Sequence, residues 1–367
     1  MALWSRIANT TIRKYIRQQE GPIMRNRKLT AMLQKRGRVS FNNSGTALDW
    51  KVAYRRAPLE RAGDMEVRTF SRQDRHKTAT IDWRSYFCGD AVSKAETLQN
   101  KGQEAIIKVT QQAAENLEAD IKETFHEELY VDGQASGNET RLLGLNSIFQ
   151  GTSAYAGGKI VSPASTYGGI SMAVGNLGGT WTTDSNGYYD WPFGTGDLTF
   201  DFWSPLQVDY TDTAWQASTK TWPNTCLEVL RFAIAGTQRN SSKSLDMTLL
   251  PVAMYVDFLD NLDEKERIMV ERNGQSSDLV SLGFKDVVNY DGCDITWEYG
   301  LPQVNSNPAG YGISLDNLEL CSQQGELFVY EGPYYRFEQQ AWLHSVDFFG
   351  NLKVKSPSKF FRLEKRT

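Results

Sequence analysis

Residues 48–54 alternate between apolar and polar or small side chains, as a β-strand with one buried face does. The alternation returns over residues 65–69, after a turn-like segment at 57–63, and again over residues 78–83. This pattern predicts a hairpin whose apolar face consists of Leu48, Trp50, Val52 and Tyr54. A two-stranded hairpin alone is marginally stable in water, so we expect another surface to cover this face.

A long helical pattern follows, from Ser93 to Tyr130. Ser93 and Glu96 have the spacing of a capping box. Apolar residues then recur every three or four positions: Leu98, Ile106, Val109, Ala113, Leu117, Ile121, Phe125 and Leu129. No proline interrupts the pattern, which predicts one helix of about 55 Å with a weak point for bending at Gly102. Its apolar stripe is narrow, so we expect this helix to span the molecule.

The two ends of the chain have different patterns. Residues 1–20 predict a basic amphipathic helix, and residues 23–40 are basic and only patchily apolar, more typical of an arm than of a domain. Residues 326–362 alternate again and predict strands of a sheet.

Between them, residues 151–222 are rich in Gly, Ser and Thr and hold 13 aromatic side chains, five of them tryptophan. Short strands and turns fit this composition. A helix is predicted at 225–236 with Asn224 as its N-cap, and an apolar strand at 247–251 is followed by an amphipathic helix. Asp291-Gly292 predicts a hairpin turn.

Charge is distributed unevenly. The formal net charge of −4 combines 19 Lys and Arg against 7 Asp and Glu in residues 1–85, a balance of +12, with −16 in the remainder. The basic front could bind nucleic acid or the acidic part of another copy of the chain. Trp4, Ile7 and Tyr15 in the same segment favour a protein surface. No apolar run has the length of a membrane span.

Catalytic chemistry has no visible candidate. The four cysteines and three histidines show no metal-ligand spacing, and there is no nucleophile elbow, phosphate loop or zinc-protease motif. We therefore expect no enzyme activity, no cofactor and no metal. The aromatic middle is compatible with a carbohydrate-binding face, but irregularly spaced aromatics more often pack in a core.

The order of these parts resembles the major capsid proteins of tailed double-stranded-DNA phages, the Hong Kong 97-type fold. Three stretches carry the resemblance, namely "TYGGI" at 166–170, "LGFKDVVNYDGCDITWEYGLP" at 282–302 and "GNLKVKSPSKFFRL" at 350–363, the last similar to a closing peripheral strand. The resemblance implies an α+β fold divided into an N-terminal arm (1–40), an extended hairpin loop (41–87), a peripheral domain with a spine helix (88–150), an axial domain (151–323) with an aromatic insertion at about 180–222, and peripheral return strands (324–367).

The resemblance further implies a phage virion protein that self-assembles, in the bacterial cytoplasm, through hexamers and pentamers into an icosahedral shell around double-stranded DNA, without sequence-specific binding. It also implies scaffolding, portal and decoration proteins as partners and no membrane. An encapsulin-like compartment or a carbohydrate-binding surface protein are the alternatives. The expected contacts between subunits are Trp4, Ile7, Tyr15, Trp50, Tyr54, Arg55, Arg56, Arg61 and Arg68.

Two features depart from the family pattern. No acidic scaffolding segment precedes the arm, so we expect a separate scaffolding protein or a segment that has been removed. Lys51 and Lys77 lie where some relatives form covalent cross-links, but nothing in the sequence identifies a partner, so cross-linking is not carried over.

Overall fold

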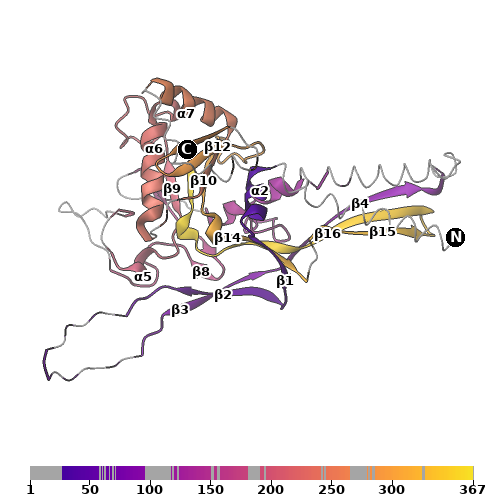
Figure 1. Ribbon diagram of the computed structural model, residues 1–367, viewed down its shortest axis with the longest axis horizontal. Helices are drawn as coiled ribbons and strands as arrows, with labels where there is room; N and C mark the ends of the chain where they lie inside the picture. The colour runs from indigo at the N-terminus through magenta and orange to yellow at the C-terminus, as the bar shows by residue number, and fades with distance from the viewer. Residues whose placement is uncertain are drawn as a thin grey trace.

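The computed structural model shows a body of sheet and helices from which two projections extend (Figure 1). One projection is a ribbon of strands, and the other is the hairpin and loop of residues 47–82. The structure describes residues 27–57, 59, 61, 63–65, 67, 70, 72–95, 117, 120–121, 124–149, 153–154, 158–180, 191–193, 196–240, 243, 245–264, 279, 282, 286–324 and 327–366.

An eight-stranded mixed sheet forms the centre of the body. Its strand order is β11-β12-β10-β13-β17-β9-β6-β5. The strands in that order are Val287–Tyr290, Cys293–Trp297, Met247–Leu250, Gly310–Ile313, Phe361–Glu364, Leu206–Asp209, Ile160–Ser162 and Ser153–Ala154. Strands β9, β10, β13 and β17 are buried at every position, as expected for strands covered on both faces.

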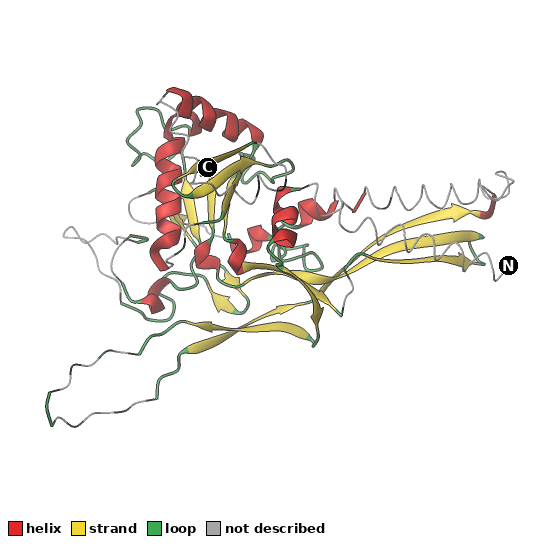
Figure 2. Cartoon of the chain, in the orientation of Figure 1, coloured by secondary structure: helices red, strands yellow, loops and turns green. Residues whose placement is uncertain are grey.

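Two helices cover one face of this sheet (Figure 2). They are α6 (Trp222–Thr237) and α7 (Val252–Glu264), and their apolar sides share one core with Leu206, Ile295 and Phe361. A second core lies on the opposite face and includes Met247 and Tyr311 from the same sheet. The sheet therefore joins two apolar cores into one body.

The ribbon belongs to a five-stranded sheet in which β16 (Ala341–Val354) pairs with three other strands. Residues 341–350 of β16 pair with β4 (Arg84–Ser93), and residues 341–347 pair with β15 (Val329–Arg336). Residues 350–354 pair with β14 (Leu318–Gln323), which also pairs with β1 (Val39–Asn43). The ribbon of β4, β16 and β15 extends away from the body (Figure 1).

The remaining elements are short. Strands β2 (Ala47–Ala53) and β3 (His76–Asp82) form the hairpin, and β7 (Thr166–Tyr167) and β8 (Ile170–Ser171) form a second one. Its turn residues, Gly168 and Gly169, both have positive φ angles that favour glycine. The other helical turns are α2 (Lys28–Lys35), α5 (Leu198–Asp201), η1 (Leu145–Ile148), η2 (Gln238–Asn240), η3 (Leu315–Asn317) and η4 (Pro357–Lys359).

Several local predictions are confirmed. The helix α6, the strand β10 followed by α7, and the hairpin of β11 and β12 around Asp291-Gly292 all occur where the patterns place them. Asn224, however, lies inside α6, whose N-cap is Thr221. Most of the predicted helix at 93–130 lies outside the described residues. Within it, Leu117, Asp120, Ile121 and residues 124–128 are helical.

Four predictions are wrong. The partner of β2 is β3 at 76–82, which contains most of the third alternating run, while Met65 and Val67 of the second run lie in no strand. Residues 28–35 form a helix, α2, whose Leu29, Met32 and Leu33 are fully buried in the body, so this part of the chain is not an arm. Strand β9 lies inside the eight-stranded sheet, so residues 206–209 are not an insertion. The stretch at 350–363 is not one closing strand, because residues 350–354 pair with β14 in the five-stranded sheet and β17 joins the eight-stranded sheet.

Candidate assembly interface

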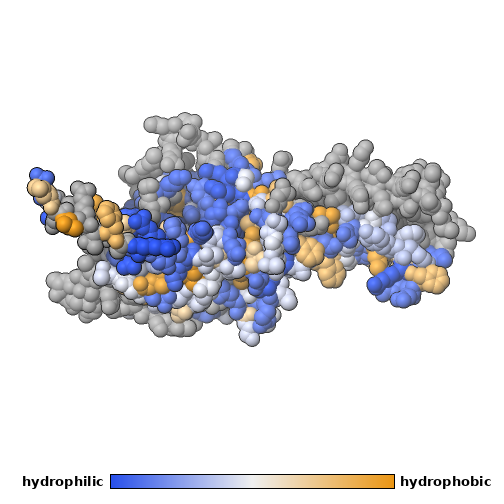
Figure 3. Space-filling model, turned by 90° about the horizontal axis from the view of Figure 1, so that it is seen from below, coloured by the Kyte–Doolittle hydropathy of each residue, from blue (hydrophilic) through white to orange (hydrophobic). Residues whose placement is uncertain are grey.

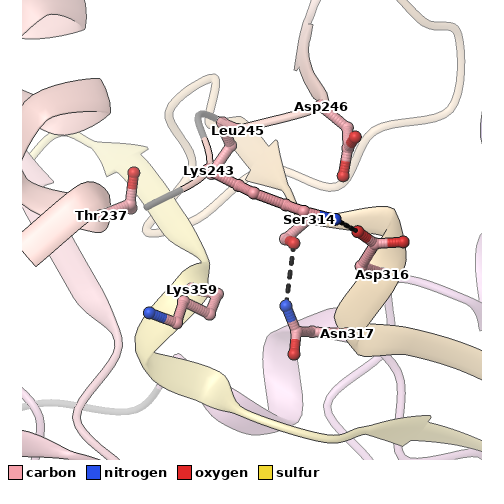
Figure 4. A pocket seen from close by; sticks show the side chains of 8 residues that line it. All are labelled: Thr237, Lys243, Leu245, Asp246, Ser314, Asp316, Asn317 and Lys359. Atoms are coloured by element: carbon pink, nitrogen blue, oxygen red, sulfur yellow. Dashed lines mark hydrogen bonds and ion pairs between the residues drawn. The ribbon is translucent and has the colours of Figure 1, made fainter. Parts of the chain in front are cut away.

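One cavity in the described part of the chain is too small for a metabolite. A cavity of about 50 Å³ is lined by Thr237, Lys243, Leu245, Asp246, Ser314, Asp316, Asn317 and Lys359 (Figure 4). Two pairs of its polar groups are formed: Lys243 Nζ lies 2.9 Å from Asp316, and Asn317 donates to Ser314 Oγ at 3.0 Å. Pockets for small organic ligands enclose roughly 300–1,000 Å³, so this cavity holds only a few waters.

No group of His, Cys, Asp and Glu in the described part of the chain is arranged to hold a metal ion. All four cysteines are free thiols, three buried and Cys88 partly exposed. Among the described residues, no helix is long and apolar enough to cross a membrane.

The described tryptophans of the aromatic segment are core residues. Trp191, Trp203, Trp215 and Trp222 are at most 5% exposed. Their indole nitrogens donate to the protein itself, for example Trp203 to the Tyr167 carbonyl at 3.1 Å. These four side chains leave no open face on which a sugar could stack. Trp181, Tyr188 and Tyr189 lie outside the described residues.

The apolar face of the hairpin is covered by its own chain. Leu48 and Tyr54 are 7% and 9% exposed, and the Tyr54 ring packs 5.8 Å from Phe202. Half-buried Trp50 lies 6.4 Å from Tyr167 and donates to the Lys355 carbonyl at 3.2 Å. The expectation that Trp50 and Tyr54 rest on a neighbouring subunit is therefore wrong, because the aromatic segment of the same chain supplies the covering surface.

The loop between β2 and β3 has the opposite character. Arg55, Arg56 and Arg61 are exposed, as sequence reasoning expected of contact residues. Four large apolar side chains of the loop are 92–100% exposed: Leu59, Met65, Val67 and Phe70. An exposed group of large apolar side chains on a soluble protein commonly marks a surface for another molecule. Arg68, Trp4, Ile7 and Tyr15 lie outside the described residues.

A second apolar surface lies on the ribbon. Pairing in β4, β16 and β15 places alternate residues on the same face, because side chains alternate along each strand. One face is covered, since Phe348 packs 5.1 Å from Phe125 of the helical segment. The other face, here called the open ribbon face, carries Phe87 at 80%, Tyr334 at 58% and Phe349 at 42% exposure.

The open ribbon face also carries acidic groups. Glu331 of β15 and Asp347 of β16 share it with Phe87, according to the register of the three strands. Figure 3 shows apolar residues both on the loop and along the ribbon, at opposite ends of the molecule. Sequence reasoning missed this surface; the exposed aromatics in the alternating patterns of residues 84–93 and 329–349 could have indicated it.

A buried polar cluster fixes the N-terminal helix α2 to the body. Glu298, at the end of β12, accepts the backbone N–H groups of Lys28 and Leu29 at 3.2 and 3.3 Å. Lys28 Nζ donates to Thr296 Oγ1 at 2.8 Å, and His126 Nε2 lies 3.7 Å from Glu298. The carboxylate thus satisfies N–H groups that a helix start leaves without partners.

Burial dominates the ionisation of this cluster. It raises the pKa of Glu298 to about 7, although the Lys28 backbone N–H and ammonium act in the opposite direction. It lowers the pKa of His126 to about 4 and the pKa of Lys28 below its ordinary value. Glu298 and His126 are 3% and 1% exposed, so solvent screens neither group.

Comparison with known proteins gives fold similarity without detectable sequence similarity. No family model and no curated protein matches the sequence. The structure superposes on a capsid protein of cyanophage A-1(L) with a TM-score of 0.53 and 14% identity, over 91% of this chain and 92% of that one. It also superposes on the capsid structure of cyanophage P-SCSP1u, with a TM-score of 0.52 and 9% identity, over 90% of this chain and 86% of that one. The chain therefore has the Hong Kong 97-type α+β fold of phage capsid proteins, as the resemblance implied.

Proposed function

We propose that this chain is the major capsid protein of a tailed phage, and that its copies assemble through hexamers and pentamers into an icosahedral shell around double-stranded DNA. The fold match over about nine-tenths of both chains supports this proposal. The observation that carries it is the loop of residues 54–75, which exposes large apolar side chains that its own subunit leaves uncovered.

The open ribbon face of a neighbouring copy is the surface that fits this loop. The loop offers arginines together with Leu59, Met65, Val67 and Phe70, and the ribbon offers Phe87, Tyr334 and Phe349 together with Glu331. The two surfaces match in apolar character and are opposite in charge, which favours both encounter and correct orientation. They also lie at opposite ends of one subunit, so each copy can give a loop to one neighbour and receive one from another (Figure 3). Such head-to-tail contacts generate rings when the rotation between copies closes.

The strength of each contact is limited by what association costs. Obligate interfaces bury about 2,000 Å² or more, roughly 30 kcal/mol of gross apolar stabilisation at 60% apolar area. Ordering the loop and losing rigid-body freedom remove much of this. Modest net contacts repeated around a ring allow misplaced subunits to dissociate before the shell closes.

The remaining partners follow from the same proposal. We expect Trp4, Ile7 and Tyr15 to contact a further neighbour, and separate scaffolding, portal and decoration proteins to act during assembly. We expect assembly in the bacterial cytoplasm and a final location in the virion. The acidic balance of −16 over residues 86–367 would reduce adhesion of packaged DNA to the wall.

Charge reversal in the loop tests the proposal. Arg55→Glu combined with Arg56→Glu should abolish shells and capsomers in electron micrographs, while circular dichroism and the thermal midpoint of the subunit stay unchanged, because both side chains are exposed. The control is Lys365→Glu combined with Arg366→Glu, two exposed positions at the C-terminal end outside the loop. A wild-type protein that remains a monodisperse monomer under all conditions, with and without a scaffolding protein, would refute the assignment.

The contents of the particles separate the proposal from an encapsulin-like compartment. A phage shell isolated from infected cells should contain genomic DNA protected from nuclease. Particles that hold an enzyme and no DNA would instead identify a compartment.

A further inference from the structure

The described apolar side chains of the loop do not set its direction. Leu59, Met65, Val67 and Phe70 are 92–100% exposed, so these side chains touch almost nothing in their own subunit. Yet the loop must reach one particular surface of a neighbour if the proposed function is right. Contacts at residues 54 and 75, where the loop leaves the body, can direct it.

Tyr54 is held from three sides at that point. Its backbone N–H donates to the Arg75 carbonyl at 3.1 Å, which ties the two ends of the loop together. Its carbonyl accepts a hydrogen bond from Thr199 Oγ1 at 3.2 Å, and its ring packs 5.8 Å from Phe202. Tyr54 is thus the last residue before the loop that the body holds, while Arg55 and Arg56 are exposed.

The surface that holds Tyr54 is itself fixed. Helix α5 begins at an N-cap, Asp197, whose carboxylate accepts the Thr199 N–H at 3.1 Å. Asp201 of the same helix forms a buried ion pair with Arg239 at 2.6 Å and accepts a hydrogen bond from Trp191 at 2.8 Å. The Asp201 side chain is 4% exposed and the Arg239 side chain 7% exposed, so solvent screens this ion pair little. The segment 198–203 is therefore a rigid support.

We propose that residues 198–203 form a socket that holds Tyr54 and thereby sets the direction in which the basic loop leaves its own subunit. This inference rests on the proposed function, because the direction matters only if the loop binds a neighbouring copy. It also gives a role to the aromatic segment, which the proposed function alone does not use. Tyr54 and Phe202 are positioning residues and do not touch the neighbour.

Preorganisation is the physical basis of the effect. A loop that has its bound direction already in the free subunit loses less conformational freedom when it binds. Each backbone residue that must be ordered anew when the loop binds lowers affinity about tenfold. Tyr54→Ala should therefore raise the protein concentration needed for assembly about tenfold or more.

Distances between spin labels test the socket directly in unassembled protein. Labels go on Leu59→Cys in the loop and Ala235→Cys, an exposed position of α6, with Cys88→Ser to remove the partly exposed thiol. The distance distribution should be narrow in the otherwise unsubstituted protein and in Tyr54→Phe, which keeps the ring. It should be at least twice as broad in Tyr54→Ala and in Phe202→Ala, with circular dichroism confirming that each variant is folded.

Assembly of the same variants, without labels, completes the test. Tyr54→Phe should assemble like the wild type, and Tyr54→Ala and Phe202→Ala should both need more protein. Equal distance distributions in Tyr54→Ala and wild type would overturn the socket, as would a wild-type distribution that is already broad. A broader distance distribution together with unchanged assembly would overturn the role of the socket in directing contacts between subunits. If the wild type never assembles, the proposed function fails, while the distances still decide whether Tyr54 holds the loop.

Discussion

The buried pair of Glu298 and His126 should give two variants opposite responses to pH. The pKa of Glu298 is raised from its ordinary 4.5 to about 7, so folding favours its neutral form. Its contribution to stability is complete below about pH 4.5 and is lost as the pH rises through 7. The pKa of His126 is lowered from 6.5 to about 4, so its contribution is complete above 6.5 and is lost as the pH falls through 4.

In the wild type, the opposite pH dependences of these two contributions to stability nearly cancel. One pKa unit corresponds to about 1.4 kcal/mol, so each group contributes about 3 kcal/mol over its full range, and about 2–3 kcal/mol of it between pH 8 and pH 5. Lys28, whose pKa is also lowered, loses the attraction of the Glu298 charge in Glu298→Gln only, which lowers its pKa further and adds to the loss of stability on acidification. Glu298→Gln removes the contribution of Glu298, so this variant should lose about 2–3 kcal/mol of stability relative to the wild type when the pH falls from 8 to 5. His126→Gln should gain about as much.

Urea unfolding of unassembled protein at pH 5, 6, 7 and 8, followed by tryptophan fluorescence, measures these slopes. The difference in unfolding free energy between variant and wild type is the quantity to compare, because the titration of all other groups then subtracts out. Glu298→Gln is expected to be the less stable protein at every pH, since the new side-chain amide can present an N–H group where Leu29 needs an acceptor. The reasoning is refuted if the difference for Glu298→Gln does not change with pH, which would mean that Glu298 is ionised throughout.

Two further predictions concern the interior. Gly312→Ala should lower the unfolding free energy, measured in urea titrations, by about 1–3 kcal/mol. The reason is that a Cβ at Gly312 would lie 2.2 Å from the Phe361 ring in the adjacent strand. An unchanged urea midpoint would show that the ring can move aside. A thiol reagent should modify Cys88 in the folded protein and the three buried cysteines only under denaturing conditions, so that one of four thiols reacts. Burial and the nearby Asp120 and Asp90 raise the Cys88 pKa, so this reaction should be slower than that of a free thiol. Reaction of more than one thiol in the folded protein would contradict the packing of the two cores.

Local features of the fold could be predicted because their causes are local. The hairpin around Asp291-Gly292 needs two residues that tolerate positive φ, and both are adjacent in the sequence. Helix α7 shows its period directly in the positions of Met254, Tyr255 and Phe258. The order of such elements along the chain, together with three short stretches, indicated the fold that the superpositions confirm.

Features that depend on distant residues could not be predicted. In the sequence, helix α2 looks like part of a basic arm. The residue that accepts the N–H groups at its start is Glu298, which lies 270 residues further along the chain and so cannot be identified from the local pattern. The alternation around Trp50 correctly indicates one covered face, but periodicity does not say what covers it. Here the cover is the aromatic segment of the same chain, which itself looked like an insertion. Position along the chain also did not reveal that β9 and β17 are neighbours in one sheet.

Electrostatics and apolar contact have different tasks in the proposed contact between copies. The arginines of the loop attract any acidic surface, and the balance of −16 over residues 86–367 offers many such surfaces in every copy. Attraction alone therefore brings subunits together without fixing their register, and it weakens as salt reduces the screening length to about 8 Å at physiological ionic strength. Only the apolar residues of the loop, held in one direction by the socket at Tyr54, can distinguish the open ribbon face from other acidic surfaces. Added salt should consequently slow the encounter of subunits more than it destabilises rings that have already closed.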